Sequence, residues 1–242
     1  MRSHYRLSGV CRAALLTALA SFAAPALAQA QTSQSVGFTL GYFALKGIDS
    51  RVEGDVLLND LQSADPLLFE IGDFNGVTFG GEWLFGFGRY LDAGVGLGFY
   101  QHTVPSVYAH LQHADGSEIE QDLKLRVIPV TFTARFLPIG RDAVVEPYIG
   151  GGFAALKWRY SETGEFVDLN FDIFPARYVA EGTEVAPVFL GGLRVPVGQW
   201  AFGGEVRYQG GEGETGGIDE GFLGDKIDLG GWTTNFTLHY RF

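Results

Sequence analysis

The sequence predicts an all-β protein, an eight-stranded antiparallel up-and-down transmembrane β-barrel. Eight segments carry apolar side chains at every second position, which is the period of a strand with one face in an apolar environment. The connections between these segments are long and short in strict turn, as expected when all turns lie at one end of a barrel and all loops at the other. The composition agrees, because 35 glycines, 14% aromatic and only 19% charged residues favour strands and turns over helices.

Residues 1–30 have the organisation of a signal peptide and are expected to be removed. Three arginines precede an apolar stretch over 13–24, and small residues before 31 provide cleavage sites. The remaining chain, 31–242, is expected to be one β-barrel domain without cysteine, because Cys11 is the only one in the sequence. It carries 14 Lys and Arg against 28 Asp and Glu, a formal charge of −14 that argues against nucleic acid as a partner.

The eight predicted strands are separated by four long and three short connections. The strands are expected over 36–46, 76–85, 90–101, 122–136, 144–160, 185–197, 200–208 and 232–242. The short connections each contain glycine and cover 86–89, 138–142 and 198–199. The long connections cover about 47–75, 102–120, 161–182 and 210–225. An even number of strands returns both chain ends to the end of the barrel that has the short turns.

The apolar face of these strands is expected to lie against lipid and not in the barrel interior. It carries the larger side chains, whereas an eight-stranded barrel encloses room only for modest ones. A soluble barrel, the alternative, would overfill its interior and expose glycines and charges. An arginine on the lipid face costs roughly 2–4 kcal/mol at the membrane midplane, which favours the phase with the arginines inward. The large outward side chains are Phe79, Trp83, Phe85, Phe99, Phe153, Phe189, Trp200, Phe202 and Phe236.

One segment departs from this phase. Over 122–127, the apolar residues Leu123, Leu125 and Val127 alternate in the opposite sense to those of 128–136. Two explanations are open. Either Pro129 marks a β-bulge, or this part of the strand extends above the membrane, where lipid no longer dictates which face is apolar.

The inward face carries eight charged side chains, which we call the lumen charge network. Acids and bases number four each, and most lie near the end with the short turns. Buried charges must be paired, which favours a structural plug across the lumen. A gate or a proton-linked site is the alternative interpretation. The acids are Glu82, Asp92, Glu146 and Glu205, and the bases are Arg135, Arg194, Arg207 and Arg241.

The sequence predicts no catalytic residue, no metal site and no cofactor. His102, His110 and His113 fall in one long connection, and His239 faces inward at the other end. Nucleophilic catalysis needs a nucleophile held by a histidine and an orienting acid, and no strand carries that pattern. His110 and His113 with Asp115 supply too few ligands in fixed geometry for a metal, so a solvated loop is expected there.

The last predicted strand ends on an aromatic residue, with Phe236, Leu238, Tyr240 and Phe242 alternating with polar side chains. It resembles the terminal strand of bacterial outer-membrane β-barrels, whose aromatic end is an assembly signal for the barrel assembly machinery. The segment 147–152 (PYIGGG) is similar to a strand opening in the OmpW-like branch. The chain as a whole resembles the small outer-membrane barrel superfamily that includes the OmpA membrane domain, OmpX and OmpW.

The resemblance implies a place in the cell outer membrane, with short periplasmic turns and four long extracellular loops. We expect a monomer in contact with outer-membrane lipid and lipopolysaccharide, with an extracellular ligand at the loops. The loops are acidic, which is typical of a solvated face. Within the first loop, 56–68 is expected to form a short amphipathic helix that caps the barrel mouth.

The function expected from these features is non-enzymatic: a structural, adhesive or envelope-integrity role through the acidic extracellular loops. The main alternative is a narrow channel or conduit for small apolar molecules. A lipid-modifying enzyme is a third and weaker alternative, because the inward histidine, His239, lies far from outer-leaflet lipid.

Overall fold

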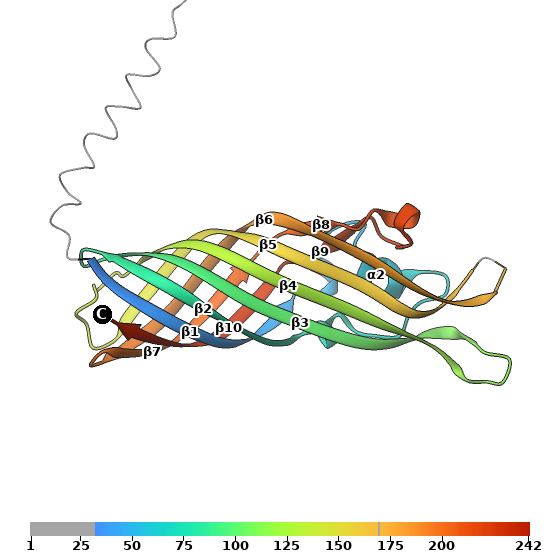
Figure 1. Ribbon diagram of the computed structural model, residues 1–242, viewed down its shortest axis with the longest axis horizontal. Coiled ribbons are helices and arrows are strands. Elements are labelled where there is room, and N and C mark those ends of the chain that lie inside the picture. The colour runs from blue at the N-terminus through green and yellow to red at the C-terminus, as the bar shows by residue number, and fades with distance from the viewer. Residues whose placement is uncertain (1–31, 169) are drawn as a thin grey trace, which may run out of the picture.

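The computed structural model describes residues 32–168 and 170–242. The expected signal peptide, 1–30, lies outside this part of the chain, and so does residue 31, the first of the expected barrel domain. The described residues form a closed barrel with a small two-stranded sheet and one α-helix beside its mouth (Figure 1).

Eight strands close the barrel, as predicted. Their order around the ring is β1, β10, β7, β6, β5, β4, β3, β2, and each neighbouring pair is antiparallel. Because β10 pairs with β1, none of these eight strands keeps an open edge. Their bounds are β1 Thr32–Leu45, β2 Gly76–Phe87, β3 Leu91–Gln112, β4 Glu118–Phe136, β5 Glu146–Val167, β6 Ile173–Val197, β7 Trp200–Gln209 and β10 Gly231–Arg241.

The short connections all lie at one end, where β1 begins and β10 ends (Figure 1). We call this the periplasmic end and the opposite one the extracellular end. Two of the extracellular connections are loops with short elements of their own. The loop between β1 and β2 contains η1 Ile48–Ser50, α2 Val56–Gln62 and η2 Ile71–Phe74, and the loop between β7 and β10 contains β8 Glu212–Glu214, η3 Gly217–Glu220 and β9 Lys226–Asp228.

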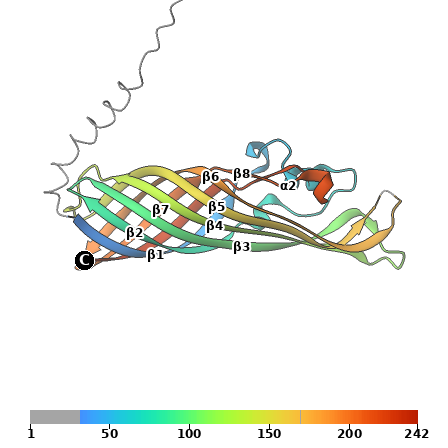
Figure 2. The same ribbon diagram turned by 45° about the horizontal axis from the view of Figure 1, so that its top comes forward.

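The other two extracellular connections are mainly strand, which differs from the prediction. The stretches 102–120 and 161–182 were expected to be loops, yet β3 and β4 are joined only by 113–117, and β5 and β6 only by 168–172. Both hairpins extend beyond the shorter strands of the barrel (Figures 1 and 2). Above the membrane, lipid no longer requires one apolar face, so the alternation that revealed the other strands is missing here.

The phase change at Pro129 is explained by the second of the two interpretations. β4 pairs with β5 in unbroken register from Gln121 to Phe136, so Pro129 marks no bulge. Leu123, Leu125 and Val127 are buried inside the barrel on the same face as the inward residues lower in the strand. The interior therefore becomes apolar toward the extracellular end. The alternation in the sequence placed the apolar side chains on the lipid face and did not predict this apolar part of the interior.

The extracellular half of the interior is filled by an apolar core. The barrel wall contributes large buried side chains, among them Trp158 and Tyr160 of β5. The predicted helix is present as α2 but ends at Gln62, and its Val56 and Leu57 are fully buried in this core. The loop between β7 and β10 adds Phe222, Ile227 and Leu229 from the other side. We call these docked loop segments and the core beneath them the outer plug.

The outer face of the barrel is an apolar belt. Exposed aliphatic and aromatic side chains cover it, and Val185 of β6 is 75% exposed. Aromatic pairs mark both borders: Trp200 and Tyr240 near the periplasmic end, and Tyr208 and Trp232 on the other side, each with ring centroids 5.1 Å apart. An exposed apolar surface that encircles the molecule is stable only against lipid.

Among the residues that the structure describes, no helix is long and apolar enough to span a membrane.

Candidate functional site: the charged lumen

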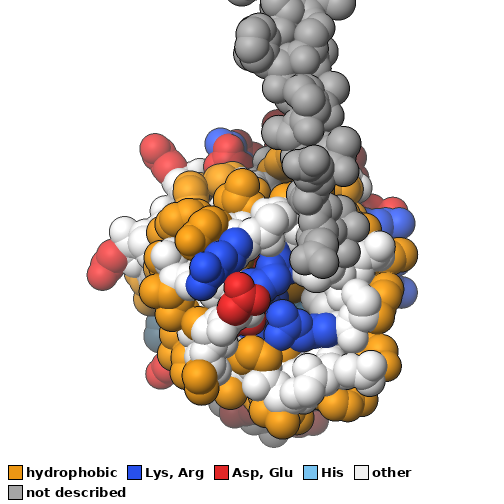
Figure 3. Space-filling model, turned by 90° about the vertical axis from the view of Figure 1, so that its left-hand side faces the viewer, with side chains coloured by type: hydrophobic (Ala, Val, Ile, Leu, Met, Phe, Trp, Pro, Cys, Tyr) orange, Lys and Arg blue, Asp and Glu red, His pale blue; other side chains and the backbone are white. Residues whose placement is uncertain are grey.

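The eight residues of the predicted lumen charge network all face the interior near the periplasmic end. They come from seven of the eight strands: Glu82 from β2, Asp92 from β3, Arg135 from β4, Glu146 from β5, Arg194 from β6, Glu205 and Arg207 from β7, and Arg241 from β10. Seen from the periplasmic end, basic and acidic side chains gather in the middle of the barrel, and hydrophobic side chains form its perimeter (Figure 3).

Arg135 is the centre of the first cluster of ion pairs. Its guanidinium donates to both carboxylate oxygens of Glu82, at 3.1 and 2.5 Å, and to Glu205 at 2.9 Å. Arg207 donates to the other oxygen of Glu205 at 3.0 and 2.7 Å. Nε2 of His239 lies 2.8 Å from Glu82. Two carboxylates thus share two arginines and a histidine, which is the fork-like pairing that suits arginine in a narrow space.

Arg194 is the centre of the second cluster. It donates to Glu146 at 2.8 Å and to Asp92 at 3.1 Å. Arg241 lies 3.5 Å from the second oxygen of Glu146. Arg141, which the sequence placed in a short turn, reaches into the lumen and donates to Asp92 at 2.6 Å. The sequence could have revealed Arg141 as a fifth inward base only if the direction in which the turn folds had been known.

Tyr148 joins the two clusters. Its ring lies between two guanidinium groups, with the carbon of Arg135 at 5.1 Å and that of Arg194 at 6.0 Å from the ring centroid. Its hydroxyl donates to Glu205 at 3.1 Å. The charges consequently form one continuous layer across the lumen.

The close packing of this layer explains two glycines of the wall. A Cβ on Gly37 of β1 would lie 2.2 Å from the ring of His239, and a Cβ on Gly86 would lie 1.9 Å from the guanidinium of Arg141. Any larger residue at these positions would push the histidine away from Glu82 or the arginine away from Asp92. The glycines leave the space that the ionic layer occupies.

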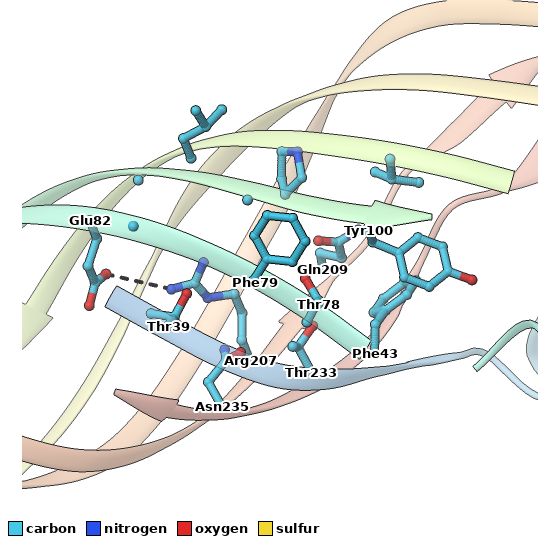
Figure 4. Close-up of a pocket in the computed structure, with 16 residues that line it drawn as sticks. Thr39, Phe43, Thr78, Phe79, Glu82, Tyr100, Arg207, Gln209, Thr233 and Asn235 are labelled. Atoms are coloured by element: carbon cyan, nitrogen blue, oxygen red, sulfur yellow. Dashed lines mark ion pairs between the residues drawn. The ribbon is translucent and has the colours of Figure 1, made fainter. Parts of the chain in front are cut away.

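A small cavity of about 50 Å³ lies between the ionic layer and the outer plug. Arg207 and Glu82, 3.8 Å apart, form its floor, and Phe43 and Tyr100 of the apolar core close it from above (Figure 4). This volume holds only a few water molecules. The lumen is thus filled both below and above the cavity.

Asp55, which the sequence placed in a solvated loop, instead holds the outer plug in place together with Asp228. Asp55 is the N-cap of α2 and accepts hydrogen bonds from the backbone of Leu57 at 3.0 Å and from Arg51 at 2.8 Å. It also accepts from the backbone N–H of Asp228 at 2.6 Å, and Asp228 in turn pairs with Lys46 at 3.0 Å. The first and fourth loops are therefore fastened to each other and to β1.

Two further acids are buried beside the plug, above the apolar belt. Asp60 of α2 and Glu162 on the extracellular part of β5 are 2% and 4% exposed. Burial raises the pKa of Asp60 well above its usual value, and the nearby charge of Glu162 adds to the effect. Burial also raises the pKa of Glu162, to about 7. These two carboxyls correct the expectation that the loop acids form a solvated face.

The histidines and the terminal strand take the following places. His113, at the tip of the β3–β4 hairpin, lies 2.8 Å from Glu165 of β5 and so ties the two long hairpins together. Asp115 accepts hydrogen bonds from Ser117 in its own turn. Within the described part of the chain, no group of three His, Cys, Asp or Glu side chains is arranged to hold a metal. Phe236, Leu238 and Tyr240 of the terminal motif point outward from β10, and Phe242, the residue after the strand, is exposed.

No model of a known protein family matches the sequence, and no curated protein matches it. Among solved structures, Ail, the attachment invasion locus protein of Yersinia pestis, is 13% identical with a TM-score of 0.39, over 88% of this chain and 99% of that chain. The N-terminal β-barrel domain of Pseudomonas aeruginosa OprF is 10% identical with a TM-score of 0.39, over 88% and 100%. Neisserial surface protein A is 10% identical with a TM-score of 0.45, over 87% and 97%.

These similarities concern the fold alone. The fold itself is evident from the closed ring of eight strands and from the apolar belt around it, which are the features of small eight-stranded outer-membrane β-barrels.

Proposed function

We propose that this outer-membrane barrel has a structural, adhesive or envelope-integrity role that it performs through its extracellular loops. The observation that carries the proposal is the double filling of the lumen, by the ionic layer below and the outer plug above. A cavity of about 50 Å³ between them offers no room for a solute path. The parts that remain accessible are the extracellular hairpins and loops.

The loops present an acidic surface for an extracellular ligand. The first and fourth loops lie side by side, because Asn59 of α2 donates to the backbone of Leu223 at 2.9 Å and β9 pairs with the first loop at Asp55. Together they expose a group of acids on one side of the barrel mouth. This acidic surface consists of Asp49, Glu53, Glu212, Glu214, Asp219, Glu220 and Asp225.

A non-enzymatic role agrees with the position of the inward histidine. His239 is fully buried in the ionic layer and paired with Glu82, far from the extracellular loops. A lipid-modifying site would need a nucleophile beside a histidine at the outer border of the belt. Lipid A from cells with and without the protein should therefore have the same mass spectrum.

We also propose that the terminal motif of β10 is the assembly signal and that the barrel is a monomer. The side chains of the motif face the lipid side, and Phe236, Tyr240 and Phe242 are exposed there. The monomer is supported by the ring itself, since all eight strands have both neighbours and none offers an edge to a second copy.

Planar-bilayer recording of the purified protein tests the closed lumen. We expect no steady unitary conductance. Insertion must be shown in parallel, by flotation with liposomes and by resistance of the barrel to protease. Steady single-channel currents from inserted protein would contradict the proposal and favour the narrow channel.

The acidic surface is tested in cells that lack the protein. Wild-type protein should restore exclusion of a dye that does not cross an intact outer membrane, or binding to an extracellular target. A variant with Asn or Gln at the seven acids should insert normally but restore neither. Full restoration by this variant would exclude a role for the acidic surface.

A further inference from the structure

A cluster of basic residues lies on the outer face of the long hairpins, apart from the acidic loops. Of the 14 Lys and Arg in residues 32–242, five point outward from three adjacent strands. We call them the basic patch: Lys124 and Arg126 on β4, Lys157 and Arg159 on β5, and Arg177 on β6.

The strand register gathers four of these cations around one small residue. Ser161 of β5 lies directly opposite Lys124 of β4. Arg159 precedes it by two positions on the same strand face and lies directly opposite Arg126. Arg177 of β6 is paired with position 163, the next outward residue of β5. The side chains surround a hollow of about 220 Å³, which Gln101 of β3 also lines.

These like charges lower the stability of the sheet when no anion is bound in the hollow. Arg126 and Arg159 are cross-strand neighbours of like charge, which is unfavourable for a β-pair. Among the acids on this face, Glu181 lies 3.7 Å from Arg159, and Asp122 and Glu120 are exposed further out on β4. In the described part of the chain, whose charge is strongly negative, Arg159 is thus the only one of the five cations that has an ion pair. An anion in the hollow would remove the repulsion.

The height of the patch on the barrel indicates where this anion comes from. On β4 the last outward apolar residue is Ile128, and the next outward residue toward the extracellular end is Arg126. On β5 the corresponding step leads from Ala155 to Lys157. Two residues of a strand rise about 7 Å. The patch therefore begins directly above the hydrocarbon, at the level of lipid headgroups.

We propose that the basic patch is a binding site for the phosphate groups of a glycolipid in the outer leaflet, with the headgroup seated over Ser161. Arginine and lysine are suited to such headgroups, and the serine hydroxyl adds a hydrogen-bond donor at the floor of the hollow. The inference rests on the proposed place of the barrel in the outer membrane. It adds a lipid contact on the side of the barrel away from the acidic surface.

The test uses the mature protein in nanodiscs of neutral phosphatidylcholine, to which bis-phosphorylated lipid A is added. Native mass spectrometry counts the lipid A molecules that stay bound. A triple variant, Lys124→Gln, Arg126→Gln and Arg159→Gln, should bind about fivefold more weakly for each cation removed. The control replaces two cations elsewhere that have only exposed partners, Arg89→Gln and Lys226→Gln, and should bind like the wild type.

Three outcomes would overturn the proposal. They are equal binding of dephosphorylated lipid A, equal loss of binding in the control variant, and displacement of lipid A by inorganic phosphate at similar concentration, which would indicate a site for soluble anions.

A second measurement excludes a merely structural role for the patch. In neutral lipid without lipid A, the triple variant should unfold at the same temperature as the wild type or higher, because a repulsion has been removed. Failure of the protein to enter nanodiscs at all would instead contradict its membrane location.

Discussion

The two halves of the barrel interior are closed by opposite chemistry. The periplasmic half is filled by arginines and carboxylates that belong to the barrel wall itself. The extracellular half is filled by apolar side chains, and part of them comes from loops that fold back onto the mouth. The ionic layer consequently stays in place for as long as the strands that carry it stay paired. The outer plug is held by contacts that can be lost while the strands stay paired.

The largest effect should follow from removing the centre of the ionic layer. Arg135→Ala removes the arginine that donates to both oxygens of the buried Glu82 and also to Glu205, and breaking a buried pair in this way costs about 3–5 kcal/mol. We expect this loss in the free energy of unfolding, measured by denaturant titration in lipid vesicles.

The control for this variant is Arg89→Ala at the periplasmic rim. Arg89 pairs with Asp142 at 3.4 Å, and both side chains are more than half exposed. Exposed pairs contribute at most about 1 kcal/mol. Equal destabilisation by the two variants would mean that the ionic layer is not a structural element of the lumen.

A smaller and local effect is expected in the outer plug. Leu57→Ala removes a fully buried side chain of α2, which costs about 2–5 kcal/mol where the surroundings cannot collapse. The loss should appear in the undocking of α2 and not in the unfolding of the barrel. Hydrogen exchange with mass spectrometry should show faster exchange in α2 and unchanged exchange in β2. The matched control, Leu68→Ala, truncates an exposed leucine of the same loop and should change neither.

The smallest effect is a pH dependence confined to the plug. The folded-state pKa values of Asp60 and Glu162 are raised by burial, so the neutral carboxyls favour the docked state. The contribution of Glu162 is complete below its unfolded pKa of 4.5 and is lost as pH rises through about 7. The raised pKa of Asp60 acts in the same direction. Protection of α2 against hydrogen exchange should be about tenfold lower at pH 8 than at a pH below the unfolded pKa of Glu162.

The double variant Asp60→Asn with Glu162→Gln should remove this pH dependence and leave that of the barrel strands unchanged. Protection of α2 that rises with pH in the wild type would contradict the assignment of the two neutral acids.

The contrast between the two halves also explains which features could be read from the sequence. Where the wall separates lipid from the lumen, every second residue must be apolar. That requirement predicted the strands, their phase and the inward direction of Arg135 and the other seven residues of the lumen charge network. Arg141 was missed because a turn residue has no phase, and its direction depends on how the turn folds over the lumen.

Above the belt the same reasoning loses its basis. The extracellular parts of β3 to β6 have water outside and an apolar core inside, so Leu123 and Leu125 look inverted relative to the membrane-spanning part. Asp55, Asp60 and Glu162 looked like solvated loop acids, because only docking of α2 in three dimensions buries them. Residue type alone does not reveal such docking.

The pairing of β1 with β10 has a consequence for the order of folding. The other seven contacts of the ring join strands that are neighbours along the barrel chain, so each closes a much shorter segment than the seam does. The seam instead joins Ser35 to Arg241 and is completed by mutual backbone hydrogen bonds between Gln34 and Phe242, at 3.2 and 2.9 Å. Closing a segment of this length carries the largest chain-entropy penalty in the molecule and depends on contacts that form last. The seam should therefore set the rate of barrel formation.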